Sequence, residues 1–84
     1  MAHNERVILL VDDHDATRET LTEVIRELGH RVLAAPSLFM AMKHVDDHLS
    51  DIDLVLTDLK LPDGTGMELM RRMRQESPGT PVVM

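Results

Sequence analysis

The sequence predicts an α/β fold, with an open parallel sheet and helices on both of its faces, formed by one domain over residues 1–84. Short apolar runs rich in β-branched and aliphatic residues alternate with longer amphipathic stretches, as strands and helices do in such folds. Parallel strands that follow one another are joined by right-handed crossovers, which place the helices on the faces of the sheet. A chain of 84 residues has room for one domain with a thin core.

The first strand and the first helix are predicted within residues 7–29. Residues 7–11 form a continuous apolar run, which suits a strand that is buried on both faces. Asp15 is the expected cap of the helix that follows, and Gly29 is its expected end. The apolar face of this helix is predicted from side chains spaced i, i+3, i+4 and i+7, namely Leu21, Val24, Ile25 and Leu28.

The second strand is predicted over residues 31–35, and Ser37 is the expected cap of a second helix. The buried face of that helix is predicted from apolar side chains at helical spacing, namely Leu38, Ala41, Met42, Val45 and Leu49. Residues 38–42 are apolar all round, so Phe39 and Met40 are expected to remain exposed. An exposed apolar patch favours a contact surface for a partner.

A third strand is predicted over residues 53–58, which are apolar in the middle and acidic at the end. A loop is expected over residues 59–64, where Pro62 and Gly64 favour a turn. Residues 81–84 predict the start of a fourth strand. The predicted order of elements is therefore βαβαβαβ.

The third helix is predicted between the loop and the fourth strand. Thr65 and Glu68 have the spacing of a capping box, which marks the start of a helix. The motif Ser-Pro-Gly at residues 77–79 predicts its end. Methionines at helical spacing are expected to fill the core rather than to bind a cofactor, namely Met67, Met70 and Met73.

Composition argues against several classes of function. The net charge of -6 disfavours nonspecific binding to nucleic acid or to an anionic membrane surface. The chain has no cysteine, so disulfides and thiolate metal sites are excluded. No apolar run approaches the roughly 18 residues of a membrane span, and residues 1–6 lack the pattern of a signal peptide. We therefore expect a cytoplasmic protein that contacts neither membrane nor nucleic acid directly.

Acidic residues follow two of the predicted strands. Asp12 and Asp13 come directly after the first strand, and Asp58 ends the third. Ligands of open parallel sheets bind beyond the carboxyl ends of the strands, so three carboxylates are expected to meet if these strands are neighbours. Their mutual repulsion calls for a divalent cation, and oxygen ligands suit Mg²⁺. A carboxylate beside Mg²⁺ is also a suitable nucleophile for phosphoryl transfer.

The acidic motifs resemble those of response-regulator receiver domains of bacterial two-component systems. The resemblance rests on the triplet Val-Asp-Asp at residues 11–13 and on residues 56–66, LTDLKLPDGTG. The proline four positions after Asp58 and the glycine-containing loop both match. The resemblance extends over essentially the whole chain and implies a flavodoxin-like fold with strand order 2-1-3-4.

The resemblance also implies roles for individual residues. Asp58 is expected to be the phosphoacceptor, and Asp13 and Asp58 are expected to bind Mg²⁺ through their carboxylates. Asp12 would contribute largely through a bound water, and Lys60 through its backbone carbonyl. The implied phosphoryl donor is a phosphohistidine on a sensor histidine kinase or a phosphotransfer protein. Such a domain promotes its own phosphorylation and dephosphorylation and is not a turnover enzyme.

The sequence departs from the family pattern in two respects. It ends shortly before the hydroxyl residue expected after strand four, and it lacks helix four, strand five with its lysine, and helix five. Residues 1–84 are therefore expected to be an incomplete receiver domain, truncated after the start of strand four. In addition, Leu38 occupies a position at the start of the second helix where the family usually has glycine.

Two other functions compete with the phosphoacceptor. A receiver-derived module that is not phosphorylated could bind proteins or form a homodimer. Its expected contact surfaces are the exposed edge of strand four and the apolar patch at residues 38–42, from Leu38 to Met42. A metal-dependent phosphatase of the haloacid-dehalogenase type would need a second aspartate two residues after Asp58, and that position holds Lys60.

Three histidines lie at positions where a functional role is conceivable. His44 and His48 have an i, i+4 spacing that can bind zinc, but no third ligand is evident and a solvated helix face is expected. His14 directly follows the acid pair and could tune it, although a plain loop residue is the expected role.

Overall fold

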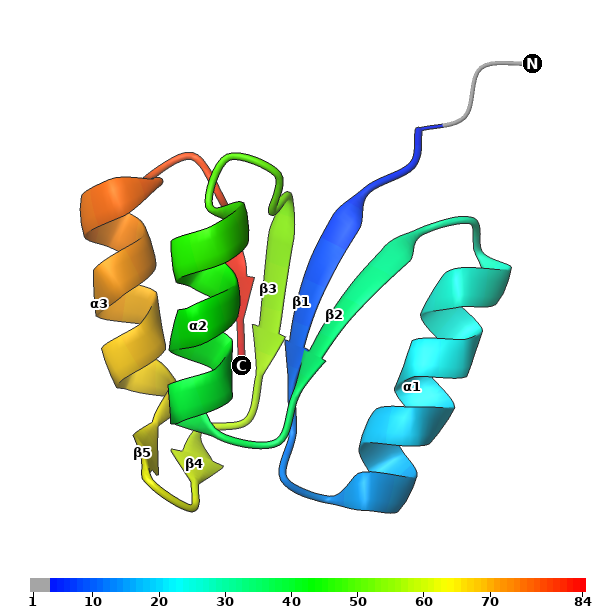
Figure 1. Ribbon diagram of the computed structural model, residues 1–84, viewed down its shortest axis with the longest axis horizontal. Helices are drawn as coiled ribbons and strands as arrows, with labels where there is room; N and C mark the ends of the chain where they lie inside the picture. The colour runs from blue at the N-terminus through cyan, green and yellow to red at the C-terminus, as the bar shows by residue number, and fades with distance from the viewer. Residues whose placement is uncertain (1–3) are drawn as a thin grey trace.

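The computed structural model describes residues 4–84 (Figure 1). The elements follow one another in the order β1 (Val7–Val11), α1 (Asp15–Glu27), β2 (Arg31–Ala35), α2 (Leu38–His48), β3 (Leu54–Thr57), β4 (Lys60–Leu61), β5 (Gly64–Thr65), α3 (Gly66–Glu76) and β6 (Val82–Val83). Residues 1–3, which belong to the predicted domain and to the N-terminal segment that lacks a signal-peptide pattern, lie outside the described residues.

Strands β1, β2, β3 and β6 form one parallel sheet, in which they lie side by side in the order β2-β1-β3-β6. Strand β1 lies between β2 and β3, and its last residue, Val11, pairs with Ala35 on one side and Thr57 on the other. Strand β6 pairs only with β3. The α/β class and the strand order 2-1-3-4, counted over the predicted strands, are thus confirmed.

The sheet lies between α1 on one face and the pair α2 and α3 on the other (Figure 1). The main core fills the space between the sheet and this helix pair. Its fully buried large side chains come from β1, β3, α2 and α3, namely Leu9, Val11, Val55, Val45, Leu69 and Met73. No helix in residues 4–84 is both long enough and apolar enough to cross a membrane.

Helix α1 covers its face of the sheet only in part. Of its predicted apolar face, Ile25 is buried, whereas Leu21, Val24 and Leu28 are exposed. Within the described residues α1 is the one helix on this face, and a single helix buries one narrow line of side chains. The apolar face predicted from the spacing is therefore buried only at Ile25.

The helix N-termini follow the predictions in two cases out of three. The Ser37 hydroxyl accepts a hydrogen bond from the Met40 N–H at 3.2 Å, and the Thr65 hydroxyl accepts one from the Glu68 N–H at 3.3 Å. The prediction that Asp15 caps α1 was wrong. His14 is the capping position, and the Asp15 carboxylate, already one residue inside the helix, pairs with Arg18 instead.

Gly29 ends α1 as predicted. Its φ of +93° is favourable for glycine and unfavourable for residues with a Cβ atom. The segment predicted as a loop over residues 59–64 contains a short antiparallel hairpin, in which β4 pairs with β5. Local turn signals predict a reversal of the chain here, but they do not show that its two arms form hydrogen bonds.

The apolar patch at residues 38–42 is smaller than the sequence suggests. Phe39 is 69% exposed, as predicted, but Leu38 and Ala41 are buried, and Met40 and Met42 pack against the core. In α3, Met73 is fully buried as expected. Met67 and Met70 are only half-buried, because Leu69 occupies the central core position between them.

Candidate functional site

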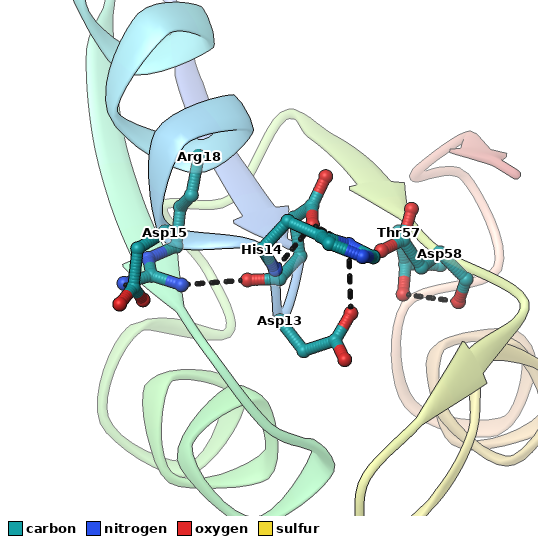
Figure 2. Close-up of polar contacts among 7 residues, drawn as sticks. Asp13, His14, Asp15, Arg18, Thr57 and Asp58 are labelled. Carbon is teal, nitrogen blue, oxygen red and sulfur yellow. Dashed lines mark hydrogen bonds and ion pairs between the residues drawn. The ribbon is translucent and has the colours of Figure 1, made fainter.

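The sheet brings the three predicted carboxylates together at its carboxyl edge. Strands β1 and β3 are neighbours, so Asp12 and Asp13 at the end of one lie beside Asp58 at the end of the other. The Asp58 N–H donates a 3.0 Å hydrogen bond to the Val11 carbonyl, which ties the two strand ends together. One potential ligand atom from each of Asp12, Asp13, His14 and Asp58 lies within 4.8 Å of all the others (Figure 2).

The three carboxylates differ in their surroundings. Asp12 is 6% exposed and its carboxylate accepts a 2.8 Å hydrogen bond from the His14 N–H. Asp13 is exposed and Asp58 is half-buried. The guanidinium of Arg18, in the first turns of α1, donates to the Asp12 carbonyl at 2.8 Å. The buried acid is thus held by the backbone and by α1, while the other two remain accessible.

The electrostatics of the cluster favour a cation among the acids. Partial burial, followed by the neighbouring carboxylates of Asp12 and Asp13, raises the pKa of Asp58 above its ordinary value of 3.8. The imidazole of His14 acts in the opposite direction. A divalent cation bound by carboxylate oxygens would relieve this repulsion. The residues therefore fit Mg²⁺, which prefers oxygen ligands and keeps several waters.

His14 belongs to this cluster, although the sequence favoured a plain loop residue. Its Nδ1 lies 3.4 Å from a carboxylate oxygen of Asp12 and 3.3 Å from one of Asp13. Figure 2 shows the ring extending from the end of β1 toward Asp58. Its position directly after the acid pair was the only signal for this placement.

The backbone that follows Asp58 is closely packed. The Gly66 N–H donates to the Leu59 carbonyl at 2.8 Å, and a Cβ atom at Gly66 would lie 2.4 Å from the Asp58 carbonyl oxygen. Lys60, in β4, points an exposed side chain away from the core. The tight loop keeps the Asp58 and Lys60 backbone close to the ends of the strands.

Among the described residues, the histidine pair of α2 belongs to no group of three or more potential metal ligands. His44 Nε2 lies 3.0 Å from the Ala34 carbonyl, and His48 Nδ1 lies 3.7 Å from an Asp51 carboxylate oxygen. Residues 4–84 contain one cluster of three or more potential metal ligands, formed by Asp12, Asp13, His14 and Asp58.

Comparison with known proteins gives the site a family context. The virulence transcriptional regulatory protein PhoP of Salmonella typhimurium is 36% identical over 77 residues, which make up 92% of this chain and 34% of PhoP. The chain thus spans about a third of the length of this relative.

Solved structures agree with the sequence comparison. The non-phosphorylated HemR receiver domain from Leptospira biflexa superposes with a TM-score of 0.87 at 32% identity, covering 93% of this chain and 61% of that domain. The response regulator TrrA from Thermotoga maritima, in complex with Mg²⁺ and BeF, gives a TM-score of 0.83 at 28% identity, covering 92% and 65%. The sequence model of a protein family, the response regulator receiver domain, matches residues 8–84. The chain belongs to the family of response regulator receiver domains.

Proposed function

We propose that Asp58 accepts a phosphoryl group and that the chain acts as the phosphoacceptor of a two-component system. One observation carries the proposal: the Asp58 carboxylate is half-buried at the end of β3, with Asp12 and Asp13 oxygens within 4.8 Å. This arrangement leaves Asp58 accessible and surrounds it with ligands for a cation. Phosphoryl transfer depends mainly on positioning and on neutralising charge.

The cation in this proposal is Mg²⁺, held by the carboxylates of Asp13 and Asp58, by Asp12 largely through water, and by the Lys60 carbonyl. When bound, Mg²⁺ neutralises charge on the carboxylates and on the phosphoryl oxygens. The raised pKa of Asp58 supports the assignment, since repulsion among the acids is the condition that a bound cation relieves. The Mg²⁺–BeF complex of TrrA shows that a structurally similar response regulator takes both groups.

The reaction is a direct transfer to the carboxylate. A carboxylate oxygen of Asp58 attacks the phosphorus of a phosphohistidine, and the P–N bond breaks. The bonding electron pair remains on the histidine nitrogen of the donor, and the product on this chain is an aspartyl phosphate. Two hydrogen bonds hold the backbone of Asp58 in place. Its N–H donates to the Val11 carbonyl, and the Thr57 hydroxyl donates to the Asp58 backbone carbonyl, each at 3.0 Å.

The donor in this proposal is a sensor histidine kinase or a phosphotransfer protein, and the reaction takes place in the cytoplasm. Each chain takes up one phosphoryl group and later loses it to water, so the cycle is regulatory rather than a turnover of substrate. The phosphorylated state then acts on a downstream output by shifting the population of two conformations.

The test is uptake of a phosphoryl group from a small donor. The protein is incubated with Mg²⁺ and acetyl phosphate, and its intact mass is measured before and after mild base. We expect the added mass of one phosphoryl group, lost in base and absent from Asp58→Asn. The matched control is Asp53→Asn, at the opposite end of β3, which should still be phosphorylated. Lack of uptake by the wild type, or uptake by Asp58→Asn, would contradict the proposal.

A further inference from the structure

Asp63 connects the β4–β5 hairpin, which lies beside the candidate site, to helix α2, which is remote in sequence. It lies between β4 and β5, and both of its carboxylate oxygens accept backbone hydrogen bonds from the first turn of α2. Oδ1 accepts from the Leu38 N–H at 2.8 Å, and Oδ2 accepts from the Phe39 N–H at 2.8 Å. The two partners lie 25 and 24 residues away in sequence. The contact is therefore tertiary, although its chemistry is that of a helix cap.

These bonds complete the N-terminus of α2. The first N–H groups of a helix have no partner within the helix. The Ser37 hydroxyl accepts from the Met40 N–H, and Asp63 accepts from the two N–H groups before it. The backbone N–H groups of Phe39 and Leu38 lower the pKa of Asp63 below its ordinary value of 3.8, so the carboxylate is charged at neutral pH. A negative charge at this end also complements the helix dipole.

The packing next to Asp63 is equally close. A Cβ atom at Gly64 would lie 2.5 Å from Leu38 Cδ2, so the Leu38 side chain rests directly on the backbone of the hairpin. Leu61, on the other arm, is buried in the main core. The hairpin is thus held from one side by α2 and from the other by the core. Leu38, where the family usually has glycine, supplies part of this contact.

The same hairpin is part of the candidate site. Lys60 in β4 pairs with Thr65 in β5, and the loop closes where the Gly66 N–H bonds the Leu59 carbonyl. Gly66 in turn abuts the Asp58 carbonyl. A shift of the hairpin relative to α2 would therefore move the backbone that presents Asp58 and Lys60.

We propose that Asp63 is a positioning residue for the phosphoacceptor site. Its carboxylate fastens the loop of residues 58–66 to the first turn of α2 and so holds Asp58 and the Lys60 carbonyl where the cation binds. In the reverse direction, filling the site tightens the bonds from Asp63 to Leu38 and Phe39. This inference rests on the proposed function, since it assigns Asp63 a role in Mg²⁺ binding at that site.

The first test is a Mg²⁺ titration by calorimetry. We expect Asp63→Ala to bind Mg²⁺ about fivefold more weakly than the wild type, in line with the loss of a helix cap. Asp63→Asn keeps one good acceptor and should fall between the two. Asp53→Ala is the matched control. The Asp53 carboxylate accepts a 2.8 Å hydrogen bond from the Val7 N–H at the amino ends of the strands, opposite the candidate site. This variant loses a backbone hydrogen bond of the same length and should bind Mg²⁺ as the wild type does.

The second test is hydrogen exchange at the Leu38 and Phe39 amides, with and without Mg²⁺ and beryllofluoride. In the wild type we expect slower exchange at both amides when the site is filled. In Asp63→Ala we expect faster exchange that no longer responds to the ligands. The same measurement at the Val7 amide, far from the site, should show no response to the ligands in either protein.

Two outcomes would overturn the role of Asp63. One is equal Mg²⁺ affinity in the wild type and Asp63→Ala. The other is an equal loss in Asp63→Ala and Asp53→Ala, because affinity would then simply follow stability. Failure of the proposed function is a separate result, seen as a wild type that binds Mg²⁺ but takes up no phosphoryl group. In that case the Mg²⁺ titration still decides whether Asp63 positions the site.

Discussion

At the scale of single residues, ionisation of the Asp58 carboxyl group destabilises the folded protein. Burial and the carboxylates of Asp12 and Asp13 raise its pKa above 3.8. The folded protein therefore holds this proton more tightly than the unfolded chain. The contribution of Asp58 to stability falls as the pH rises from 3.8 through the raised pKa, and the ionised group is destabilising at neutral pH.

This argument predicts the effect of Asp58→Asn on stability. Without divalent cations, the variant should have a higher unfolding temperature than the wild type at pH 7, and the difference should shrink toward pH 4. With millimolar Mg²⁺ the wild type should gain stability and the variant much less, because a ligand stabilises the state that binds it. Thermal unfolding followed by circular dichroism, in EDTA and in Mg²⁺, measures both. The control is Asp47→Asn, an exposed acid on α2.

A lower unfolding temperature for Asp58→Asn in EDTA would contradict the assignment of repulsion among the acids. An equal gain from Mg²⁺ in both proteins would show that the cation binds elsewhere.

Lys60 gives a second prediction at this scale. Its side chain is exposed, and the expected ligand is its backbone carbonyl. Lys60→Ala should leave Mg²⁺ affinity within about threefold of the wild type, since a single exposed charge contributes little. Calorimetric titration measures this, with Lys43→Ala on α2 as the control. A loss of tenfold or more, roughly 1.4 kcal/mol, would show that the side chain takes part.

At the scale of elements, Arg72 connects α3 to α2. Its guanidinium donates to the Asp46 carboxylate and, at 3.3 Å, to the Met42 carbonyl, both in α2. Within α3, its Nε donates to the Glu76 carboxylate at 2.5 Å. Arg72 is partly shielded from solvent, whereas its acidic partners are more exposed. A network of this kind contributes more than an isolated surface pair.

Arg72→Ala should therefore lower the free energy of unfolding by about 1 kcal/mol, measured by urea denaturation. Arg71→Ala removes a neighbouring exposed charge and should change it by less than about 0.5 kcal/mol. Equal effects of the two substitutions would mean that the network between the helices does not stabilise the fold.

The β4–β5 hairpin depends on the absence of a side chain at Gly66. A Cβ atom there would lie 2.4 Å from the Asp58 carbonyl oxygen and 3.1 Å from Thr57 Cγ2. Gly66→Ala should cost about 1–3 kcal/mol, typical of overpacking, and should also weaken Mg²⁺ binding because it displaces the Asp58 backbone. Gly79→Ala meets no atom within 4 Å and serves as the control. Urea denaturation and calorimetry would show the prediction wrong if the two variants behave alike.

At the scale of the whole molecule, β6 and β2 are the two edge strands of the parallel sheet formed by residues 4–84. Strand β6 pairs only with β3 in the described chain, and Val83 is 51% exposed. Unpaired edges are templates for pairing with a second copy. At high concentration we expect residues 1–84 to self-associate, and Val83→Lys to shift the equilibrium toward the monomer in sedimentation experiments.

The apolar patch at residues 38–42 was the other surface predicted for a homodimer, and the structure leaves Phe39 as its one largely exposed side chain. Phe39→Ala should therefore have a smaller effect on self-association than Val83→Lys. The reverse order would place the contact on α2 rather than on the sheet edge.

The secondary structure and the acidic positions could be predicted from the sequence because both depend on local patterns. A five-residue apolar run suits a buried strand, and a carboxylate directly after it lies at the strand end by chain geometry alone. The parallel architecture follows from the alternation of elements. The order of the strands came from the family resemblance, because the pattern of apolar residues does not show which strands are neighbours.

Only the tertiary structure decided the contacts that neither local patterns nor the family resemblance indicates. It brought His14 among the carboxylates, paired Asp63 with a helix that begins 25 residues earlier, and left Leu28 of α1 open to solvent. Hydrogen-bond partners and solvent exposure are properties of the packed chain, set by the distances between elements. Sequence spacing specifies the face of a helix, whereas only the assembled sheet and helices determine what that face touches.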